Sequence, residues 1–211
     1  MNLRIFENIV ELARAAARTI GQREHASVAI SGGSTPKPLY ELLGRDLRDD
    51  DPITWVLVDE RYVPKTDPQS NAAMIERTLF AKGVPPTHRW LHFDTSLNDP
   101  AATAAEFEAQ WDIDQLDIVL LGVGDDGHTA SLFPGTAVLD IEDRVASEVF
   151  VPRLDQWRVT LTRPVIRAAK LRIVLAAGES KATIIDEVRR GVPHPIAMVT
   201  EGVETWWFVT G

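Results

Sequence analysis

The strongest constraint on the fold is a short apolar run that ends abruptly in glycines. Residues 117–135 read DIVLLGVGDDGHTASLFPG, so the run at Ile118–Leu121 leads directly into Gly122, Gly124 and Gly127. A continuous apolar run of this length between turn signals predicts a strand that is buried on both faces. The loop after it would carry polar groups to the carboxyl edge of a sheet, where open α/β sheets bind their ligands.

The same succession of apolar run, turn and helix recurs along the chain and predicts the fold class. Apolar runs at 27–30, 53–58 and 171–177 have the same strand character as Ile118–Leu121. Strands that alternate with helices indicate βαβ units and a parallel sheet. We therefore predict a single α/β domain over residues 1–211, with a mostly parallel, open, Rossmann-like sheet and helices on both faces.

The remaining elements follow from periodicity and from helix start and stop signals. We expect an amphipathic helix over 1–21, a helix from Pro36 to about Leu43, and a helix that the turn at 67–71 caps. Three further helices are expected at 98–111, at 162–169 and from Lys181 to Arg190. Weaker strand candidates lie at 90–92, 145–151, 158–161, 196–199 and 206–209. Pro134 excludes a long helix directly after His128.

Composition limits the kind of partner and compartment. The chain of 211 residues contains no cysteine, which excludes disulfides and thiolate nucleophiles. Its net charge of −9 argues against a nucleic-acid partner, because such binding depends on neutralising phosphates. Charged residues such as Arg4 and Glu7 interrupt the N-terminus, and no apolar run approaches the length of a membrane span. We expect a cytoplasmic protein, either a monomer or a weak homodimer, with no membrane partner.

A glycine-rich loop after the first predicted strand has the composition of an anion site. Gly32, Gly33, Ser34 and Thr35 precede Pro36, which suits the first position of a helix with Ser34 or Thr35 as its cap. Backbone N–H groups and the positive end of a helix would then face one point. No Gly-Lys-[Ser/Thr] follows, so this is not a nucleotide-binding P-loop. A tight turn that binds nothing remains the alternative.

Charged side chains follow two other predicted strands. Asp59 and Arg61 come after the run at 53–58, and Lys181 comes after the run at 171–177. Arg61 would bind an oxyanion through its planar guanidinium, while Asp59 would orient a substrate hydroxyl or a histidine. Lys181 would be a second cation for a phosphate. Ordinary surface positions for these residues are the alternative. In a parallel sheet, however, all these strand ends emerge at the same edge as His128.

His128 is the side chain of the 124–131 loop that can exchange a proton near neutral pH. The other histidines lack such surroundings and are expected at ordinary surface or packing positions: His25, His88, His92 and His194.

Two alternative functions for the central loop are disfavoured. Residues 122–127 match the dinucleotide fingerprint G-x-G-x-x-G, but Asp125 and Asp126 would occupy the place of the pyrophosphate. Pro134 also leaves too little room for the crossover helix. A metal site at Asp125, Asp126 and His128 lacks a second histidine at a ligand spacing, so we predict no metal.

Five segments in order resemble one known family. They read SGGSTPKPLYELL at 31–43, WVLVDERYVPKTDPQSN at 55–71, DIVLLGVGDDGHTASLFPG at 117–135, RVTLT at 158–162 and GESKATII at 178–185. Together they are similar to the 6-phosphogluconolactonases, over nearly the whole chain.

Two features separate this pattern from that of related glucosamine-6-phosphate deaminases, which share the SGGSTP and DGH loops. The deaminases typically carry DGHIAFNEPG and DEY, whereas this chain has Ser131-Leu132-Phe133 and Arg61. One departure from the lactonase pattern lies before RVTLT, where a Lys-Pro-Pro stretch is replaced by residues 152–157. Arg153 is the candidate to replace the family lysine.

The resemblance implies hydrolysis of 6-phospho-D-glucono-1,5-lactone to 6-phospho-D-gluconate, the second step of the pentose phosphate pathway. It implies that His128 takes a proton from the attacking water, with Asp59 and Arg61 as further catalytic residues. It implies neither a metal nor an organic cofactor. The residues expected at the phosphate are Gly32, Gly33, Ser34, Thr35, Arg61 and Lys181, and those expected around the rest of the substrate are Gly124, Asp126, Gly127 and Ser131.

Two other functions stay open at this point. One is deamination or isomerisation of a sugar phosphate on the same fold, and the other is a sugar-phosphate sensor without catalytic activity.

Overall fold

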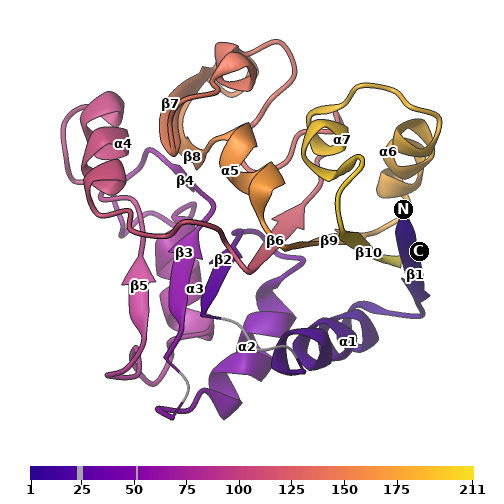
Figure 1. Ribbon diagram of the computed structural model, residues 1–211, viewed down its shortest axis with the longest axis horizontal. Helices are drawn as coiled ribbons and strands as arrows, with labels where there is room; N and C mark the ends of the chain where they lie inside the picture. Colours follow the sequence, from indigo (N-terminus) through magenta and orange to yellow (C-terminus); the bar gives the residue numbers. More distant parts are fainter. Residues whose placement is uncertain (23–25, 51) are drawn as a thin grey trace.

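The carboxyl ends of the main strands all point the same way because the main sheet is parallel throughout. The computed structural model describes residues 1–22, 26–50 and 52–211, and His25 lies outside them. Within this part of the chain, seven parallel strands form the main sheet and three antiparallel strands form a second sheet (Figure 1). The main sheet has the order β1 (Asn2–Phe6), β10 (Thr205–Thr210), β9 (Leu171–Ala177), β6 (Ile118–Gly122), β2 (Ser27–Ile30), β3 (Thr54–Leu57) and β5 (Arg89–Leu91). The second sheet has the order β4 (Asp59–Arg61), β8 (Gln156–Leu161) and β7 (Ala146–Val151).

Helices cover both faces of the main sheet. Figure 1 shows α1 and α2 on one side of β6, β9 and β10, and α5, α6 and α7 on the other. The helices are α1 (Ile9–Gly21), α2 (Lys37–Asp46), α3 (Asn71–Thr78), α4 (Pro100–Ala109), α5 (Arg163–Ala168), α6 (Ser180–Arg189) and α7 (Pro195–Thr200), with short 3₁₀ turns η1 (Ala137–Asp140) and η2 (Pro152–Leu154). No helix in the described part of the chain is long and apolar enough to cross a membrane.

The central strands are buried as their apolar sequences predict. All four residues of β2 are buried, and Ile118–Leu121 of β6 are at most 1% exposed. A strand without a solvated face cannot shift its register by one residue without moving every side chain to the opposite face. The predicted fold class is therefore confirmed: an α/β fold with a mostly parallel sheet between helices.

The N-terminal segment differs from the expected single helix over 1–21. Asn2–Phe6 forms β1, which pairs in parallel with β10 at the edge of the sheet. Asn8 then caps α1, because its side chain accepts hydrogen bonds from the backbone N–H groups of Val10 and Glu11. The cap fixes the start of the helix after the strand rather than at the first residue.

The predicted strand at 196–199 is wrong, because these residues belong to helix α7. Pro195 occupies the first turn, where its fixed φ angle and missing N–H favour a helix start. A short apolar run alone is consistent with either a strand or a helix, and here the flanking proline decides in favour of the helix.

The second sheet was not predicted, although the weak strand candidates at 145–151 and 158–161 are confirmed as β7 and β8. The chain moves from the first sheet to the second at Val58. Its N–H donates to Ile30 O (3.0 Å) in the main sheet, and its carbonyl accepts from the N–H of Leu161 (2.8 Å), the last residue of β8. Asp59 and Arg61 thus leave the main sheet and join an antiparallel one.

Helix α2 differs from prediction at both ends. It begins at Lys37, with Pro36 at the cap position and no side-chain hydrogen bond from Ser34 or Thr35 to its first turn. It also continues past Gly44, the predicted stop, to Asp46. Gly44 has a packing role instead: a Cβ at this position would lie 2.5 Å from the backbone oxygen of Leu79, just after α3.

We predict that Gly44→Ala lowers the free energy of unfolding by about 1–3 kcal/mol, because the added methyl group overpacks this contact between backbones. Gly21→Ala at the end of α1 is the matched control, since a Cβ there meets nothing within 4 Å. It should leave stability unchanged or raise it by up to about 1 kcal/mol. Urea unfolding measures both, and equal effects of the two substitutions would contradict the packing role of Gly44.

Candidate functional site

The strand ends singled out from the sequence meet in one cleft. Its volume is about 330 Å³, and it lies at the carboxyl edge of β2, β6 and β9. The residues that line it are 31–36, Asp59, Arg61, Asn71, 122–124, 128–130, Arg158, Leu175, Ala177 and Lys181. The geometry thus brings the glycine-rich loop, the histidine, the Asp-Glu-Arg segment and the lysine to one place.

His128 is held by a carboxylate two residues before it. Asp126 Oδ1 accepts hydrogen bonds from the backbone N–H of His128 (3.1 Å) and from its Nδ1 (2.5 Å). The Asp126 pKa is lowered by these hydrogen bonds and nearby positive charges, against the opposing effect of burial, so the carboxylate is ionised and can only accept. Nδ1 therefore carries the proton, and Nε2 is the nitrogen that is free to accept one.

The ring of His128 is fixed on its other sides by a glycine and a phenylalanine. A Cβ on Gly124 would lie 2.0 Å from His128 Nδ1, so any larger residue would displace the imidazole. Phe133 stacks on the imidazole with ring centroids 4.2 Å apart and planes at 24°. The backbone also closes the loop, since Gly124 N–H donates to the His128 carbonyl (2.8 Å). These contacts explain the small residue at Gly124 and the aromatic one at Phe133.

The surroundings lower the His128 pKa below its ordinary value. Burial is the main cause, because it disfavours the charged imidazolium. The negative charges of Asp126 and Asp59 oppose this effect, and the positive charge of Arg153 adds to it. A neutral imidazole at neutral pH is the form that can accept a proton.

Asp59 does not hydrogen-bond His128. Its Oδ2 accepts from the hydroxyl of Ser131 (2.7 Å), and both residues are buried. The carboxylate that orients the histidine is therefore that of Asp126 and not, as predicted, that of Asp59, whose hydrogen-bond partner is Ser131. A role toward a substrate hydroxyl stays a prediction for Asp59, which lines the cleft.

The glycine-rich loop offers unused backbone donors to the cleft. Gly33 has a φ of +104°, which favours glycine at this position. No hydrogen bond from the N–H groups of 32–35 to another part of the described chain is found. The loop is also close to Asn71, because a Cβ on Gly32 would lie 1.9 Å from Asn71 Oδ1. Four free amides beside a helix start suit an anion.

Lys181 lines the cleft and forms an ion pair with a residue outside its lining. Its Nζ lies 2.6 Å from Oδ1 of Asp125. The lysine side chain is 19% exposed, whereas that of Asp125 is 73% exposed. An anionic ligand would therefore compete with a solvated carboxylate for this ammonium group.

Gly127 does not line the cleft but fixes the loop that does. It has a φ of +75°, and a Cβ there would lie 2.5 Å from the ring of His194. Its carbonyl accepts from Ile196 N–H (3.0 Å) at the start of α7. His194 itself donates from Nε2 to the Glu187 carboxylate (2.7 Å), a packing position as predicted from the sequence.

Two residues of the cleft were missed in the sequence. Arg158 is the first residue of RVTLT and projects from β8, and Asn71 begins α3 and donates from its side chain to Asp59 O (2.8 Å). Alternation along 156–161 is the signal that would have singled out Arg158. Arg153 lies on η2 and pairs with Oδ2 of Asp126 (2.7 Å), the same carboxylate that accepts a hydrogen bond from His128.

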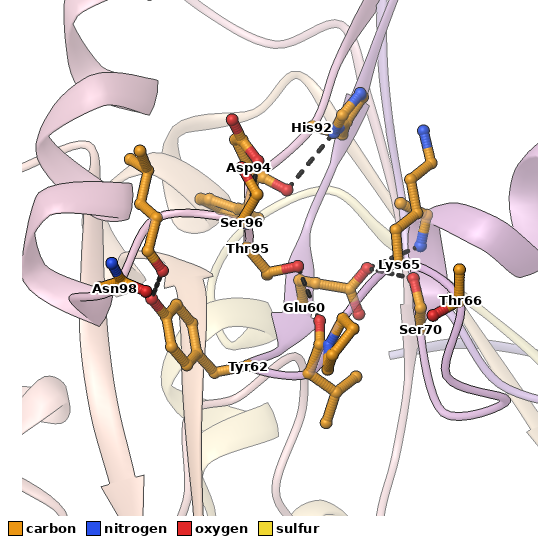
Figure 2. Close-up of a pocket in the computed structure, with 15 residues that line it drawn as sticks. Glu60, Tyr62, Lys65, Thr66, Ser70, His92, Asp94, Thr95, Ser96 and Asn98 are labelled. Atoms are coloured by element: carbon orange, nitrogen blue, oxygen red, sulfur yellow. Dashed lines mark hydrogen bonds between the residues drawn. The ribbon is translucent and has the colours of Figure 1, made fainter.

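A second cavity lies on the other face of β4. Successive residues of a strand point to opposite faces, so Asp59 and Arg61 face the cleft while Glu60 and Tyr62 line the cavity of about 590 Å³ in Figure 2. Glu60 is 1% exposed, and burial raises its pKa. Its carboxylate accepts from Ser70 Oγ and from three backbone N–H groups, including those of the first turn of α3. This carboxylate is therefore structural, because it anchors the start of α3 to β4.

No group of three His, Asp or Glu side chains in the described ranges is arranged to hold a metal ion.

The model of one protein family matches residues 5–207, nearly the whole chain, and carries the description "Glucosamine-6-phosphate isomerases/6-phosphogluconolactonase". The chain belongs to this family.

Relatives within the glucosamine-6-phosphate isomerase/6-phosphogluconolactonase family are similar over most of their length. A protein of Nostoc sp. named 6-phosphogluconolactonase is 39% identical over 180 residues, which is 80% of this chain and 73% of the relative. The crystal structure of 6-phosphogluconolactonase from Leishmania guyanensis superposes with a TM-score of 0.87 at 29% identity, and covers 99% of this chain and 96% of that one. A monomeric glucosamine-6-phosphate deaminase has a TM-score of 0.81 at 22% identity, with 100% and 97% coverage, which shows the shared fold alone.

We predict that the His128 pKa responds in opposite directions to two substitutions around it. Arg153→Gln should raise it, because a positive charge that disfavours the imidazolium is lost. Asp126→Asn should lower it, because the carboxylate that favours the imidazolium is lost. An NMR titration of the ring protons measures both, with Arg190→Gln at the far end of α6 as a matched change of charge. Shifts in the same direction would contradict the arrangement.

Proposed function

We propose that the protein hydrolyses 6-phospho-D-glucono-1,5-lactone to 6-phospho-D-gluconate, the second step of the pentose phosphate pathway. The observation that carries this proposal is the single cleft shared by His128, the free amides of 32–35 and Lys181. Membership of the family and the relatives named 6-phosphogluconolactonase support it. As part of the same proposal, the protein acts in the cytoplasm as a monomer or weak homodimer.

The phosphate of the substrate binds at the glycine-rich loop. The amides of Gly32, Gly33, Ser34 and Thr35 donate to its oxygens, and Lys181 leaves Asp125 to pair with it. Binding this remote dianion fixes the sugar ring, so that binding energy is used to orient the reacting carbon.

His128 transfers the proton. A water molecule attacks C1 of the lactone while His128 Nε2 takes one of its protons, and the carbonyl electrons move onto oxygen. The tetrahedral intermediate then collapses: the bond between C1 and the ring oxygen breaks, and the imidazolium returns the proton to that oxygen. The new carboxylic acid ionises to the carboxylate and releases one proton. Asp126 stabilises the imidazolium through Nδ1 during both steps.

Asp59, held by Ser131, accepts a hydrogen bond from a hydroxyl of the sugar. No covalent intermediate is needed, because the Ser131 hydroxyl is engaged by Asp59 and is fully buried. Deamination of glucosamine 6-phosphate on the same fold is the alternative, as is a sensor without turnover. Release of ammonia would identify the first, and thermal stabilisation by sugar phosphates without hydrolysis would identify the second.

We predict that His128→Ala lowers kcat by about 10²–10⁴-fold, the usual contribution of general acid–base catalysis, with little change in KM. Lys181→Ala should chiefly raise KM, because it removes a phosphate contact. In the wild type, the acid limb of the pH profile should fall below the ordinary histidine pKa of about 6.5. Proton release from freshly prepared lactone measures all three, against spontaneous hydrolysis.

His92→Ala is the control for these variants, since His92 lines the other cavity. An active His128→Ala enzyme would remove the assignment of the base. A wild-type protein that does not exceed the spontaneous rate would remove the function itself.

A further inference from the structure

Two arginines stand opposite each other in the cleft because of strand register. In the antiparallel pairing of β4 with β8, Arg61 is the partner of Arg158, and Asp59 is the partner of Thr160. Residues paired in this way have side chains on the same face, with Cβ atoms about 4.5–5.5 Å apart. Both arginines line the cleft. The register therefore presents two guanidinium groups side by side.

This arrangement is unfavourable without a ligand. Arg158 is only 8% exposed, and burial together with the positive charges of Arg61 and Arg153 lowers its pKa. The Nε atoms of Arg61 and Arg158 are both buried, and neither has a hydrogen-bond partner within the described residues. Nη1 of Arg61 donates a hydrogen bond to the backbone carbonyl of Gln69 (2.7 Å). Like charges in directly opposed positions destabilise a sheet, and buried donors without acceptors add to the cost.

The nearby carboxylate offsets only part of this charge. Asp59 lies two residues before Arg61 on the same face of β4, and one of its oxygens is engaged by Ser131. Glu60, on the opposite face, is saturated by its four hydrogen bonds. Two arginines with buried, unpaired nitrogens in a ligand cleft indicate a site for planar oxygens, which guanidinium groups bind in pairs.

The arginine pair lies toward the imidazole. The Arg158 Cζ is 5.5 Å from the centre of the Phe133 ring, and that ring stacks on His128 at 4.2 Å. Lys181 follows β9 on one side of β6, whereas the 32–35 loop follows β2 and β4 continues from β3, both on the other side. The cleft therefore carries its lysine and its arginine pair on different sides of the histidine strand.

We propose that Arg61 and Arg158 together bind the C1 oxygens of the substrate: the lactone carbonyl as it becomes negative, and then the carboxylate of the product. This inference rests on the proposed function and adds the division of the cleft into two anion sites. The phosphate belongs to the amides of 32–35 and Lys181, and the carboxyl group belongs to the arginine pair. Positive charge that meets a developing oxyanion stabilises the transition state more than the neutral ground state.

Two ligands that differ only at C1 test this division. 6-Phosphogluconate has a carboxylate at C1, and sorbitol 6-phosphate has a neutral hydroxymethyl group there. By calorimetry, Arg158→Gln should weaken 6-phosphogluconate binding about 10- to 100-fold, the loss of a charge-assisted hydrogen bond, and leave sorbitol 6-phosphate within about twofold. Lys181→Gln is the matched control and should weaken both ligands by the same factor.

Arg158→Lys covers the case in which Arg158→Gln does not fold. It keeps the charge but not the planar fork, so it should weaken 6-phosphogluconate alone, by less than Arg158→Gln. Equal weakening of both ligands by the Arg158 variants would overturn the proposal and assign Arg158 to the phosphate. No weakening of either would also overturn it.

The binding readout separates this inference from the proposed function. Selective loss of 6-phosphogluconate in a protein that does not hydrolyse the lactone would support the arginine pair and reject the enzyme. Hydrolysis by the wild type without selective loss would do the reverse. A wild-type protein that binds neither ligand would overturn both.

Discussion

Parallel pairing of β2, β6 and β9 is the constraint on which the site depends. Because these strands run in one direction, the loops after them converge: the free amides of 32–35, His128 and Lys181 meet at one edge of the sheet. The strands are buried on both faces, so a slip in register would move every side chain to the opposite face and disrupt the packing there. The loops after them carry unpaired donors and glycines with positive φ angles, such as Gly33 and Gly127.

The second sheet supplies what parallel strands alone do not provide. At Val58 the chain leaves β3 and pairs with β8, which brings Asp59 and Arg61 over the cleft from the side. The same pairing sets Arg158 opposite Arg61. The loops after the main sheet thus contribute backbone N–H donors, His128 and Lys181, while the small sheet contributes Asp59, Arg61 and Arg158. Although the protein has a net charge of −9, three of its positively charged side chains line the cleft where an anion would bind: Arg61, Arg158 and Lys181.

Opposing charges also prepare the imidazole. Asp126 fixes the tautomer and favours the charged ring, while burial and Arg153 disfavour it. The balance favours the neutral form, in which Nδ1 donates to Asp126 and Nε2 is available to accept a proton. Arg153 takes this place on η2, in the segment where the sequence departs from the Lys-Pro-Pro of the lactonases.

Much of the fold could be predicted from the sequence because local signals and burial agree there. Ile118–Leu121 and 171–177 could be little else than buried strands. The signals failed where pairing partners distant in sequence decide the outcome. Asn2–Phe6 becomes a strand only because β10 lies beside it. The prediction at 196–199 failed for a local reason, since the proline before these residues starts a helix.

The candidate site divides in the same way. The loops carrying His128 and Lys181 could be placed at one edge by the rule for parallel strands. The sequence could not say that Asp126 rather than Asp59 bonds the histidine, since that depends on the conformation of the 124–128 loop. Arg158 was missed because its position opposite Arg61 follows from an antiparallel register that joins residues about a hundred positions apart.

The most direct test is a crystal structure of the protein with 6-phosphogluconate. The account predicts the phosphate on the amides of 32–35 beside Lys181, and C1 at the other end of the cleft with an oxygen about 3–3.5 Å from His128 Nε2. A ligand bound in the reverse orientation, or in the cavity behind β4, would contradict it.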